Sequence, residues 1–467
     1  MEPCAYKFCM TLILLATIWV SLLYMYYSLE LQRNYTPISR PTGPACPKPK
    51  LQNDVLVVLR VDAADVLKTL PVHFETVLNC VPDYVIYSDI EGEADGQFIY
   101  NTLDESNNSI KSNSPNLRPH SQSQRTSERQ KHQNTPEKEL RRRKSPQPET
   151  KGSLSMIDRA LRHRPDAKWF VFLEADTYML WQNMLEYLAK FNTSHPYYLG
   201  KHIHLDDILL AHGGPGFVLS NPASKRVVKY WREHQEEWQQ YTKVQVASDV
   251  MLGKALEEVD VNLVWPSPFL HENSLATFNW KGLTDAQPWC FKPVAFHHMT
   301  KAEFNMMWHF EEERRRRKPN GNGPSSRDIF KRLVYPQLQP KCIDWDNLSA
   351  GAEYSNETLA LLSPEDRVRL PPVYQEASFS FERCRAACES KSTCIQFSYT
   401  IGKCTTSDEL RLGYAIDVHS SHTGIEDVTD LKGESSIQSG WIMSRVSSHV
   451  QELDRLCNIL EDSYFKI

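Results

Sequence analysis

The sequence lacks a strong excess of charge of either sign. Its 467 residues include 53 Lys or Arg and 58 Asp or Glu, which gives a formal net charge of −5. A basic surface of the kind that binds phosphate backbones is therefore not indicated, and we expect no nucleic-acid partner. Hydrophobic residues make up 41% of the chain, as in a globular protein, and the length allows two domains with additional segments.

Charged residues are missing from one stretch near the amino terminus. Residues 9–27, CMTLILLATIWVSLLYMYY, are nineteen consecutive positions without a charge, enough to cross a hydrocarbon core. The stretch ends in bulky aromatic residues rather than in the small residues of a cleavage site, which favours an uncleaved anchor. We therefore predict a transmembrane signal anchor at 9–27, a cytosolic tail at 1–8 and a stem at 28–50.

Cysteines and glycosylation sequons indicate on which side of the membrane the folded part lies. Beyond the anchor there are nine cysteines and five Asn-x-Ser/Thr sequons, at Asn34, Asn107, Asn192, Asn347 and Asn356. Disulfides form in oxidising secretory compartments, and N-glycans are added there. We expect a single-pass type II protein with a lumenal body.

Apolar residues are scarce in one long internal segment. Between residues 111 and 150 there are ten Lys or Arg, four Glu, two Leu and no aromatic residue. Such a composition buries too little apolar surface to offset the entropy of ordering. We predict a disordered basic insertion at 105–150, in which the run Arg-Arg-Arg-Lys (141–144) is a solvated charge cluster rather than a binding site.

On either side of this insertion, strand and helix patterns alternate. DVLVVLRV (54–61) and YVIYSD (84–89) are buried-strand patterns, and apolar residues recur at helical spacing between them. A helix pattern at 153–164 precedes the apolar run at 169–173, and another follows it. This succession indicates a parallel α/β arrangement, which we assign to a domain at 51–335.

Cysteines crowd together after residue 340. Four lie within 21 residues: Cys384, Cys388, Cys394 and Cys404. This density is typical of a small disulfide-stapled module, which we predict at 340–460, and the spacing C-x3-C-x5-C-x9-C does not fit a zinc ribbon. Cys342 and Cys457 flank the cluster and are candidates to pair with each other. Because nine is odd, at least one cysteine is free or forms an intermolecular bond.

Two carboxylates stand where a buried strand breaks off. In WFVFLEADTYMLW (169–181), the apolar run ends at Glu174-Ala175-Asp176. Such positions in an open α/β sheet lie where ligands bind, and both acids can approach a divalent cation if the chain turns there. The alternative is that Glu174 is a surface residue and that Asp176 caps a helix beginning at Thr177.

Three further stretches carry residues suited to chemistry beside a cation. AHGGPGFVLS (211–220) contains three glycines, Gly213, Gly214 and Gly216, which permit close approach of the backbone. SDVMLGKAL (248–256) places Asp249 at the start of a helix, and WCFKPVAFHHMT (289–300) places His297 and His298 after a short strand. An imidazole there would complete an oxygen-rich metal site, and strand alternation predicts that only one of the two points into it.

These four stretches, in this order, resemble the fringe and core 1 β-1,3-galactosyltransferase group, glycosyltransferase family 31. The closest likeness is to its fungal branch, in which a GT-A domain precedes a PAN/apple-like module. EADTYML resembles the D-x-D metal motif, AHGGPGFVLS the glycine-rich acceptor-side loop, SDVMLG the E-D-V-x-x-G segment and AFHHM the F-H motif. The resemblance covers about residues 54–310 without the insertion, and 375–445. It implies a Rossmann-like mixed α/β sheet followed by a small disulfide-rich α+β module.

The resemblance also implies roles for the matching residues. Asp176 and His297, with His298 as the alternative, would coordinate Mn²⁺ or another divalent cation that bridges the diphosphate of a UDP-sugar. Glu174 would contact the nucleotide ribose or the metal shell. Asp249 would be the general base for the acceptor hydroxyl.

Weaker candidates complete the set. Arg60 and Asp89, at the ends of the first two strands, would join Glu174 and Asp176 in binding the donor; the alternative is that both are ordinary strand-end polar residues. Trp289 would join the three glycines on the acceptor side.

Several positions depart from the family pattern. The acidic motif begins with Glu174 instead of Asp, Ser248 replaces an acid, and Pro215 interrupts the glycine loop. A Trp- and Lys-rich stretch of the fungal branch, expected before the acidic strand, is not found in the sequence.

The leading interpretation is a Golgi membrane glycosyltransferase that inverts configuration. It would move a sugar, with galactose in a β-1,3 linkage as the first candidate, from UDP to a glycan or glycoprotein such as O-linked GalNAc. The second interpretation is a catalytically silent GT-A/PAN lectin-like protein, favoured by the departures and opposed by the intact Asp249 and histidine pair. A glycosidase using Glu174 and Asp176 is disfavoured, because side chains one residue apart on a strand diverge. The sequence does not identify the sugar.

Overall fold

The first apolar runs of the chain form neighbouring parallel strands. β1 (Val55–Arg60) pairs in parallel with β2 (Tyr84–Ser88) and with β5 (Trp169–Glu174), the run that ends in the acidic motif. Among the described residues the sheet has eight strands, in the order β11-β7-β10-β5-β1-β2-β4-β3. The others are β3 (Gly92–Ala94), β4 (Gln97–Asn101), β7 (Tyr198–Gly200), β10 (Phe217–Ser220) and β11 (Leu263–Val264). Because β10 runs antiparallel to β5 and β7, the sheet is mixed, and the predicted mixed α/β class is confirmed.

The structure is a computed structural model that describes residues 46–47, 50–102, 152–205, 208–241, 248–264, 270–282, 287–416 and 436–464. The predicted tail, anchor and insertion lie outside these ranges, as does the stem apart from residues 46, 47 and 50. Across the described ranges, no helix has both the length and the apolar character needed to cross a membrane.

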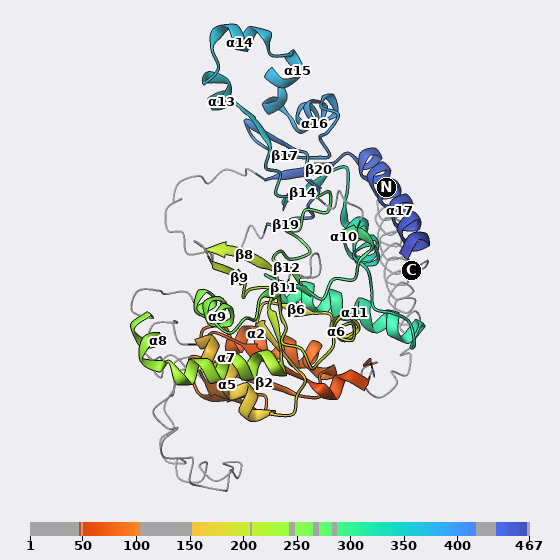
Figure 1. Ribbon diagram of the computed structural model, residues 1–467. Helices are drawn as coiled ribbons and strands as arrows, with labels where there is room; N and C mark the ends of the chain where they lie inside the picture. Colours follow the sequence, from red (N-terminus) through yellow and green to blue (C-terminus); the bar gives the residue numbers. More distant parts are fainter. Residues whose placement is uncertain are drawn as a thin grey trace, which may run out of the picture. The chain divides into compact units, whose positions relative to one another are not determined.

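Helices cover both faces of the large sheet. Successive side chains of a strand point to opposite sides, so an apolar strand such as β1 contributes to a core on each face. Val55, Val57 and Leu59 of β1 belong to one apolar cluster, and Leu56 and Val58 belong to another. The first cluster includes residues of α2 (Val66–Glu75), α6 (Trp181–Leu188) and α11 (Lys301–Arg317). The second cluster includes residues of α5 (Gly152–His163), α7 (Asn221–Glu233) and α9 (Ser248–Glu257), of which α5 and α7 lie side by side (Figure 1).

A short second sheet joins the acidic motif to the histidine pair. Its strands, in spatial order, are β12 (Leu270–His271), β13 (Ala295–Phe296) and β6 (Tyr178–Met179). Phe296 of β13 pairs in antiparallel fashion with Tyr178 of β6. Since Asp176 shortly precedes β6 and His297 directly follows β13, this pairing brings the two side chains together.

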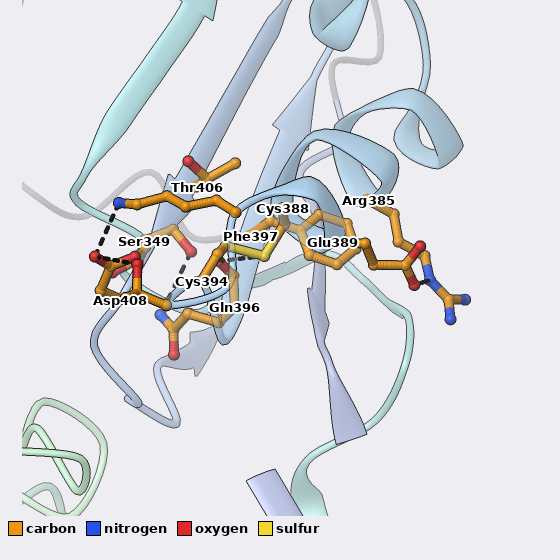
Figure 2. The surroundings of a disulfide bond; sticks show 12 residues. Ser349, Arg385, Cys388, Glu389, Cys394, Gln396, Phe397, Thr406 and Asp408 are labelled. Atoms are coloured by element: carbon orange, nitrogen blue, oxygen red, sulfur yellow. Dashed lines mark hydrogen bonds and ion pairs between the residues drawn. A yellow bond between two sulfur atoms is a disulfide. The ribbon is translucent and has the colours of Figure 1, made fainter. Parts of the chain in front are cut away.

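The C-terminal part has a sheet of its own. Its five described strands, all antiparallel, follow the order β14-β20-β17-β18-β16. They are β14 (Cys342–Ile343), β16 (Ala352–Ser355), β17 (Gln396–Thr400), β18 (Lys403–Ser407) and β20 (Gln438–Trp441). Helix α16 (Phe381–Ser390) packs on this sheet and is tied to it by Cys384–Cys404 and Cys388–Cys394. Figure 2 shows the second bridge beside Phe397, which is fully buried.

The four clustered cysteines therefore bond among themselves. The PAN/apple-like nature of this part and the predicted limits, 51–335 and 340–460, stay predictions. The remaining described elements are short, apart from the last helix. They are η1 (Lys50–Asp54), η2 (Val77–Cys80), β8 (His202–Leu205), β9 (Ile208–Ala211), α8 (Gln235–Tyr241), α10 (Gln287–Cys290), α12 (Ser326–Ile329), η4 (Phe330–Val334), η5 (Tyr335–Gln337), β15 (Trp345–Asp346), α13 (Asn356–Ala360), α14 (Pro364–Arg369), α15 (Pro372–Gln375), η6 (Ala377–Phe379), β19 (Tyr414–Ala415) and α17 (Met443–Tyr464).

The predicted pairing of Cys342 with Cys457 is wrong. Cys457 bonds to Cys290, and Cys342 is the free cysteine among the described residues. Asp454, three positions before Cys457 on α17, accepts a hydrogen bond of 3.2 Å from the Trp289 indole, so this face of α17 lies against α10. Cysteine spacing along the chain does not reveal which face of a helix meets which neighbour.

Removing the Cys290–Cys457 bridge should destabilise the protein. The double variant Cys290→Ala/Cys457→Ala opens a link between residues 167 positions apart, and we expect the free energy of unfolding to fall. The expected loss is about 2–5 kcal/mol, the usual range for a native bridge. Cys342→Ala is the matched control, because it removes a thiol that forms no bridge, and we expect a change below about 1 kcal/mol. Denaturant unfolding measures both. A loss in Cys342→Ala equal to that of the double variant would reinstate the Cys342–Cys457 pair.

One glycosylation sequon is inaccessible in the folded protein. The Asn347 side chain is fully buried, and its amide donates hydrogen bonds to the carbonyls of Phe397 (3.1 Å) and Gly440 (3.4 Å). The nitrogen that would carry a glycan is thus buried and already donates two hydrogen bonds within the folded protein. Asn192 and Asn356 are exposed.

Glycan occupancy should follow this difference in burial. When the chain is produced through a secretory pathway, we expect N-glycans at Asn192 and Asn356 and none at Asn347. Peptide mass spectrometry after enzymatic deglycosylation in ¹⁸O-labelled water measures the occupancy of each site. A glycan at Asn347 in folded, monodisperse protein would contradict the hydrogen bonding described above.

Candidate functional site

A cavity of about 580 Å³ opens where β1 and β5 end. Its described lining is rich in carboxylates and consists of Arg60, Val61, Asp62, Asp65, Thr69, Glu174, Ala175, Asp176, Gly213, Gly214, Ser248, Asp249 and His297. Ligands of open α/β sheets bind at the carboxyl ends of strands, so this cavity is the candidate site. Residues from all four sequence motifs meet in it.

The register of the two central strands places Arg60 beside Glu174. The two residues are direct partners in the β1–β5 ladder, and Arg60 Nη1 lies 3.5 Å from Glu174 Oε1. Burial raises the pKa of Glu174 to about 7; the charge of Arg60 opposes this rise, and the charges of Asp249 and Asp62 add to it. The 3.5 Å contact makes Glu174 an ion-pair partner of Arg60 whenever its carboxyl is ionised.

The chain turns at the acidic motif and is held there by three hydrogen bonds. Thr177 N donates to Glu174 O at 3.0 Å, His73 Nε2 donates to Ala175 O at 2.7 Å, and Met299 N donates to Asp176 O at 2.9 Å. The next helix, α6, begins only at Trp181 and has Leu180 as its N-cap. The alternative in which Asp176 caps a helix is therefore wrong.

Both histidines of the pair approach Asp176. His297 Nδ1 lies 3.1 Å from Asp176 Oδ1, and His298 Nδ1 lies 3.1 Å from Asp176 Oδ2. As expected, only one of the two lines the cavity, but both rings reach Asp176, because β13 ends at Phe296 and His298 has a φ of +56°. In this left-handed conformation strand alternation no longer holds. His297 is buried and lines the cavity, whereas His298 is exposed.

Asp176, His297 and His298 have the arrangement and chemistry to hold a metal ion. One candidate ligand atom from each lies within 4.8 Å of the others. Burial alone would raise the pKa of Asp176, but the hydrogen bonds and charges of the two histidines outweigh it and lower the pKa. The carboxylate is thus ionised, as a ligand must be, and oxygen with imidazole nitrogen suits divalent ions such as Mn²⁺. Glu174 is not part of this cluster in the described structure.

The glycine loop holds Asp249 in the cavity. Asp249 lies in the first turn of α9, and Gly213 N donates to its Oδ2 at 3.0 Å. A Cβ at Gly213 would lie 2.8 Å from that oxygen, so a side chain there would displace the carboxylate. Burial raises the pKa of Asp249, although the Gly213 hydrogen bond and the charge of Arg60 oppose the rise. A carboxylate with a raised pKa is a suitable proton acceptor.

The other two glycines serve different contacts. A Cβ at Gly214 would lie 2.5 Å from His297 Nε2. Gly216 has a φ of +92°, and a Cβ there would lie 2.6 Å from Phe172 O on β5. At its three glycines the loop therefore contacts Asp249, His297 and the central strand β5 in turn.

This combination of groups lies mostly within residues 90–312, which match the model of a known family. That family is described as Fringe-like, and the segment is similar to it. It spans a little under half of the chain, and over this span the predicted resemblance to the fringe group is confirmed. The fungal branch and the PAN/apple-like module stay predictions.

One solved structure with a matching chain is the crystal structure of a glycosyltransferase involved in the glycosylation of the major capsid of PBCV-1. The sequences are 12% identical, and the match covers 55% of this chain and 99% of that one, with a TM-score of 0.24.

Two predicted residues lie away from the cavity. Asp89 is not among its described lining residues; Asp89 Oδ1 accepts a hydrogen bond of 2.7 Å from Ala63 N and so holds the chain that follows β1. Trp289 is buried on α10 against Phe330, with ring centroids 5.1 Å apart, and donates to Asp454. Trp289 therefore packs the core rather than the acceptor-side loop.

Several residues at the site were not predicted. Asp62 and Asp65 line the cavity just after β1 and before the matched segment 90–312. They are carboxylates that follow a buried strand, so the pattern that identified the acidic motif after β5 would have identified them too. Thr177 follows that motif directly but carries no charge to mark it. His73 lies on α2 among apolar residues, and nothing in its sequence context distinguishes it from a core histidine.

Acid should destabilise the protein through His73. Burial lowers the pKa of His73 from 6.5 to about 4, although its bond to Ala175 and the charge of Asp176 oppose this, so the unfolded chain binds a proton that the folded chain rejects. The free energy of unfolding should be fully retained above pH 6.5 and fall as the pH drops toward 4, by on the order of 3 kcal/mol from this residue. Denaturant unfolding at several pH values measures the slope.

His73→Gln is the matched variant, because its amide offers an N–H donor in a similar position and does not titrate. We expect a shallower pH dependence in this variant than in the wild-type protein, with the remaining slope due to other groups. Equal slopes in the two proteins would contradict the assignment to His73.

Proposed function

We propose that this chain is a metal-assisted, inverting glycosyltransferase of the GT-A type. It would move a sugar from a UDP-sugar donor to a hydroxyl of a glycan or glycoprotein. The observation that carries the proposal is the shared cavity: a carboxylate of raised pKa, Asp249, lies together with Asp176 and His297 at the carboxyl ends of the central strands. The Fringe-like match of the same segment supports it.

In the proposed reaction Asp249 is the general base. Its carboxylate accepts the proton of the acceptor hydroxyl as that oxygen forms a bond to the anomeric carbon of the sugar. The bond from this carbon to the UDP oxygen breaks on the opposite face, and its electron pair leaves with UDP, so the configuration inverts. A divalent cation held by Asp176 and His297 would supply positive charge against the departing diphosphate. The Gly213 N–H keeps Asp249 Oδ2 in place.

Arg60 and Glu174 form the donor side in this proposal. The guanidinium is held 3.5 Å from Glu174, in register on the neighbouring strand. Glu174 therefore orients Arg60 rather than binding the cation. The longer side chain of Glu174, compared with the aspartate of the family pattern, gives it the reach for this pairing.

The finer parts of the proposal concern sugar and compartment. Galactose transferred in a β-1,3 linkage to O-linked GalNAc follows from the resemblance to the core 1 group. The four described disulfides suit an oxidising compartment. We place the cavity in the lumen of the Golgi, on a type II protein anchored through residues 9–27.

A GT-A/PAN lectin-like binding protein without turnover is the alternative. The observation that favours it is the contact between Arg60 and Glu174, because an ionised Glu174 competes with a diphosphate for the guanidinium in the cavity lining. Turnover separates the two proposals, whereas binding of UDP does not.

Turnover should depend on Asp249. We would secrete residues 34–467, supply Mn²⁺ with a panel of UDP-sugars, and measure UDP release with GalNAc-peptide and simple glycoside acceptors. Asp249→Asn should lower kcat by about 10²- to 10⁴-fold, the usual contribution of a general base, and chelation should abolish turnover. Asp89→Asn is the matched control, because the same chemical change is made at a carboxylate outside the cavity lining.

The pH profile gives a second readout of the same assignment. Because Asp249 must be ionised to accept a proton and its pKa is raised by burial, kcat/KM should fall as the pH is lowered through a value above the ordinary range for aspartate. Undiminished activity in Asp249→Asn would overturn the choice of base. Absence of turnover with every donor, in folded wild-type protein, would favour the binding protein.

A further inference from the structure

A second group of polar side chains lies beside the candidate site and takes no part in the proposed reaction. Glu272 Oε2 forms an ion pair with Lys201, and Glu272 Oε1 lies 3.2 Å from His212 Nδ1. About a third of each of these three side chains is exposed to solvent, so solutes can reach them. They are not among the described lining residues of the cavity. We call these three residues the Glu272 cluster.

The short second sheet places Glu272 in line with Asp176 and His297. Glu272 directly follows β12, His297 directly follows β13, and the two strands run parallel. Asp176 shortly precedes β6, which runs antiparallel to β13, so all three residues lie at the same edge of the sheet. Because β13 is the middle strand, Glu272 lies on the side of His297 away from Asp176.

The hairpin of β8 and β9 brings the rest of the Glu272 cluster to this edge. Lys201 directly precedes β8, His212 directly follows β9, and His212 N donates to Lys201 O at 2.7 Å. The next residue, Gly213, donates to the Asp249 carboxylate. The Glu272 cluster is therefore joined to the proposed base through the first glycine of the loop.

Gly214 lets the cluster pack closely against the histidine pair. A Cβ at this position would lie 2.5 Å from His297 Nε2 and 3.2 Å from His212 Cε1, so a side chain would displace both rings. The two rings are nearly perpendicular, at 87°, with centroids 6.4 Å apart. Thr177 Oγ1 donates to Gly214 O at 2.7 Å and holds the loop in this position. His212 thus has Glu272 on one side and the cavity residue His297 on the other.

The chemistry of the cluster suits uncharged hydrogen-bond donors. Burial alone would raise the pKa of Glu272, but the hydrogen bond and charge of Lys201 outweigh it and lower the pKa. Burial lowers the pKa of His212, although the charge of Glu272 opposes this, so the ring is neutral at neutral pH. An ionised carboxylate only accepts hydrogen bonds, and each of its oxygens keeps a lone pair after its first partner. A sugar hydroxyl supplies such a bond without adding a charge to a site whose lysine and glutamate already balance.

We propose that Glu272 binds the acceptor sugar, by accepting a hydrogen bond from a second polar group of the same ring whose hydroxyl loses its proton to Asp249. Lys201 is the positioning residue that holds the carboxylate in place. The inference rests on the proposed transferase and deepens it, because it assigns acceptor recognition to the end of the short sheet beyond His297. It also narrows the acceptor to a sugar, since a serine or threonine side chain offers one hydroxyl only.

The test crosses a variant at Glu272 with acceptors that each lack one polar group. The acceptors are benzyl N-acetylgalactosaminide and its analogues without the 2-acetamido group, the 4-hydroxyl or the 6-hydroxyl. With the full chain, kcat/KM should be about 10- to 100-fold lower for at least one analogue than for the parent, as expected for a hydrogen bond to a charged group. Glu272→Ala should lower kcat/KM for the parent by a similar factor, through the acceptor KM, and lose nothing further with that analogue.

Two further variants separate recognition from structure. Glu353→Ala is the matched control, because Glu353 forms a similar half-exposed ion pair with Lys403, at 2.7 Å, in the C-terminal sheet. We expect it to keep the wild-type discrimination between parent and analogue. Lys201→Met should weaken this discrimination, since the carboxylate is no longer held. Circular dichroism establishes that each variant is folded, and an unchanged KM for the donor shows that the effect is confined to the acceptor.

Binding gives a readout that does not need turnover. Saturation-transfer NMR with UDP and the same four glycosides should show weaker binding of the parent to Glu272→Ala than to the wild-type protein. Glu272→Gln is the milder variant, because its amide oxygen still accepts a hydrogen bond without the charge, and its loss should lie between those of the wild-type protein and Glu272→Ala.

The outcomes separate this inference from the proposed reaction. Glycoside binding that depends on Glu272, in a protein that turns over no donor, would refute the transferase and leave the sugar-binding role intact. Turnover in which Glu272→Ala discriminates between parent and every analogue as the wild-type protein does would overturn the role of Glu272 and leave the transferase intact. Wild-type protein that neither binds nor glycosylates the parent glycoside would overturn this inference together with the acceptor proposed above.

Discussion

The hydrogen bond from His73 to the carbonyl of Ala175 is the constraint on which the site depends. At this point β5 leaves a fully covered sheet, and its next residues must enter a second sheet without leaving a buried carbonyl unpaired. A neutral histidine on α2 supplies the donor, and burial keeps it neutral. With the turn fixed there, Asp176 faces the histidine pair and Thr177 reaches the glycine loop. The cavity is therefore a consequence of how one strand ends.

Much of this arrangement could be predicted from local patterns. The runs at 54–61, 84–89 and 169–173 are apolar because both faces of their sheet are covered, and they form β1, β2 and β5. The order of the motifs predicted that Asp249, His297 and the glycines belong to the site. This was possible because their placement depends on the backbone of the adjacent strand, helix or loop. The pairing of Arg60 with Glu174 was not predictable, because the register of two strands far apart in the chain is set by packing.

The failures share a physical cause: each depended on a conformation or a face that the sequence does not encode locally. Only His297 lines the cavity, as predicted, but the contact of His298 with Asp176 was missed, because it depends on the left-handed conformation of His298. Trp289 follows the geometry of a short helix and packs inward. The partner of Cys457 depends on which face of α17 packs against α10, and these two helices are far apart in the sequence. The bridges within the cluster, in contrast, join positions only 20 and 6 residues apart.

The Cys290–Cys457 bridge has a consequence for how the protein is made. Cys290 precedes His297 by seven residues, on the approach to the histidine pair. A ribosome releases the whole Fringe-like segment long before Cys457 is synthesised, and Cys290 must wait for a partner 167 positions downstream. Every described group of the cavity is then already translated, but Cys290 is not yet joined to α17. A chain that ended before Cys457 would carry these site residues and lack this bridge.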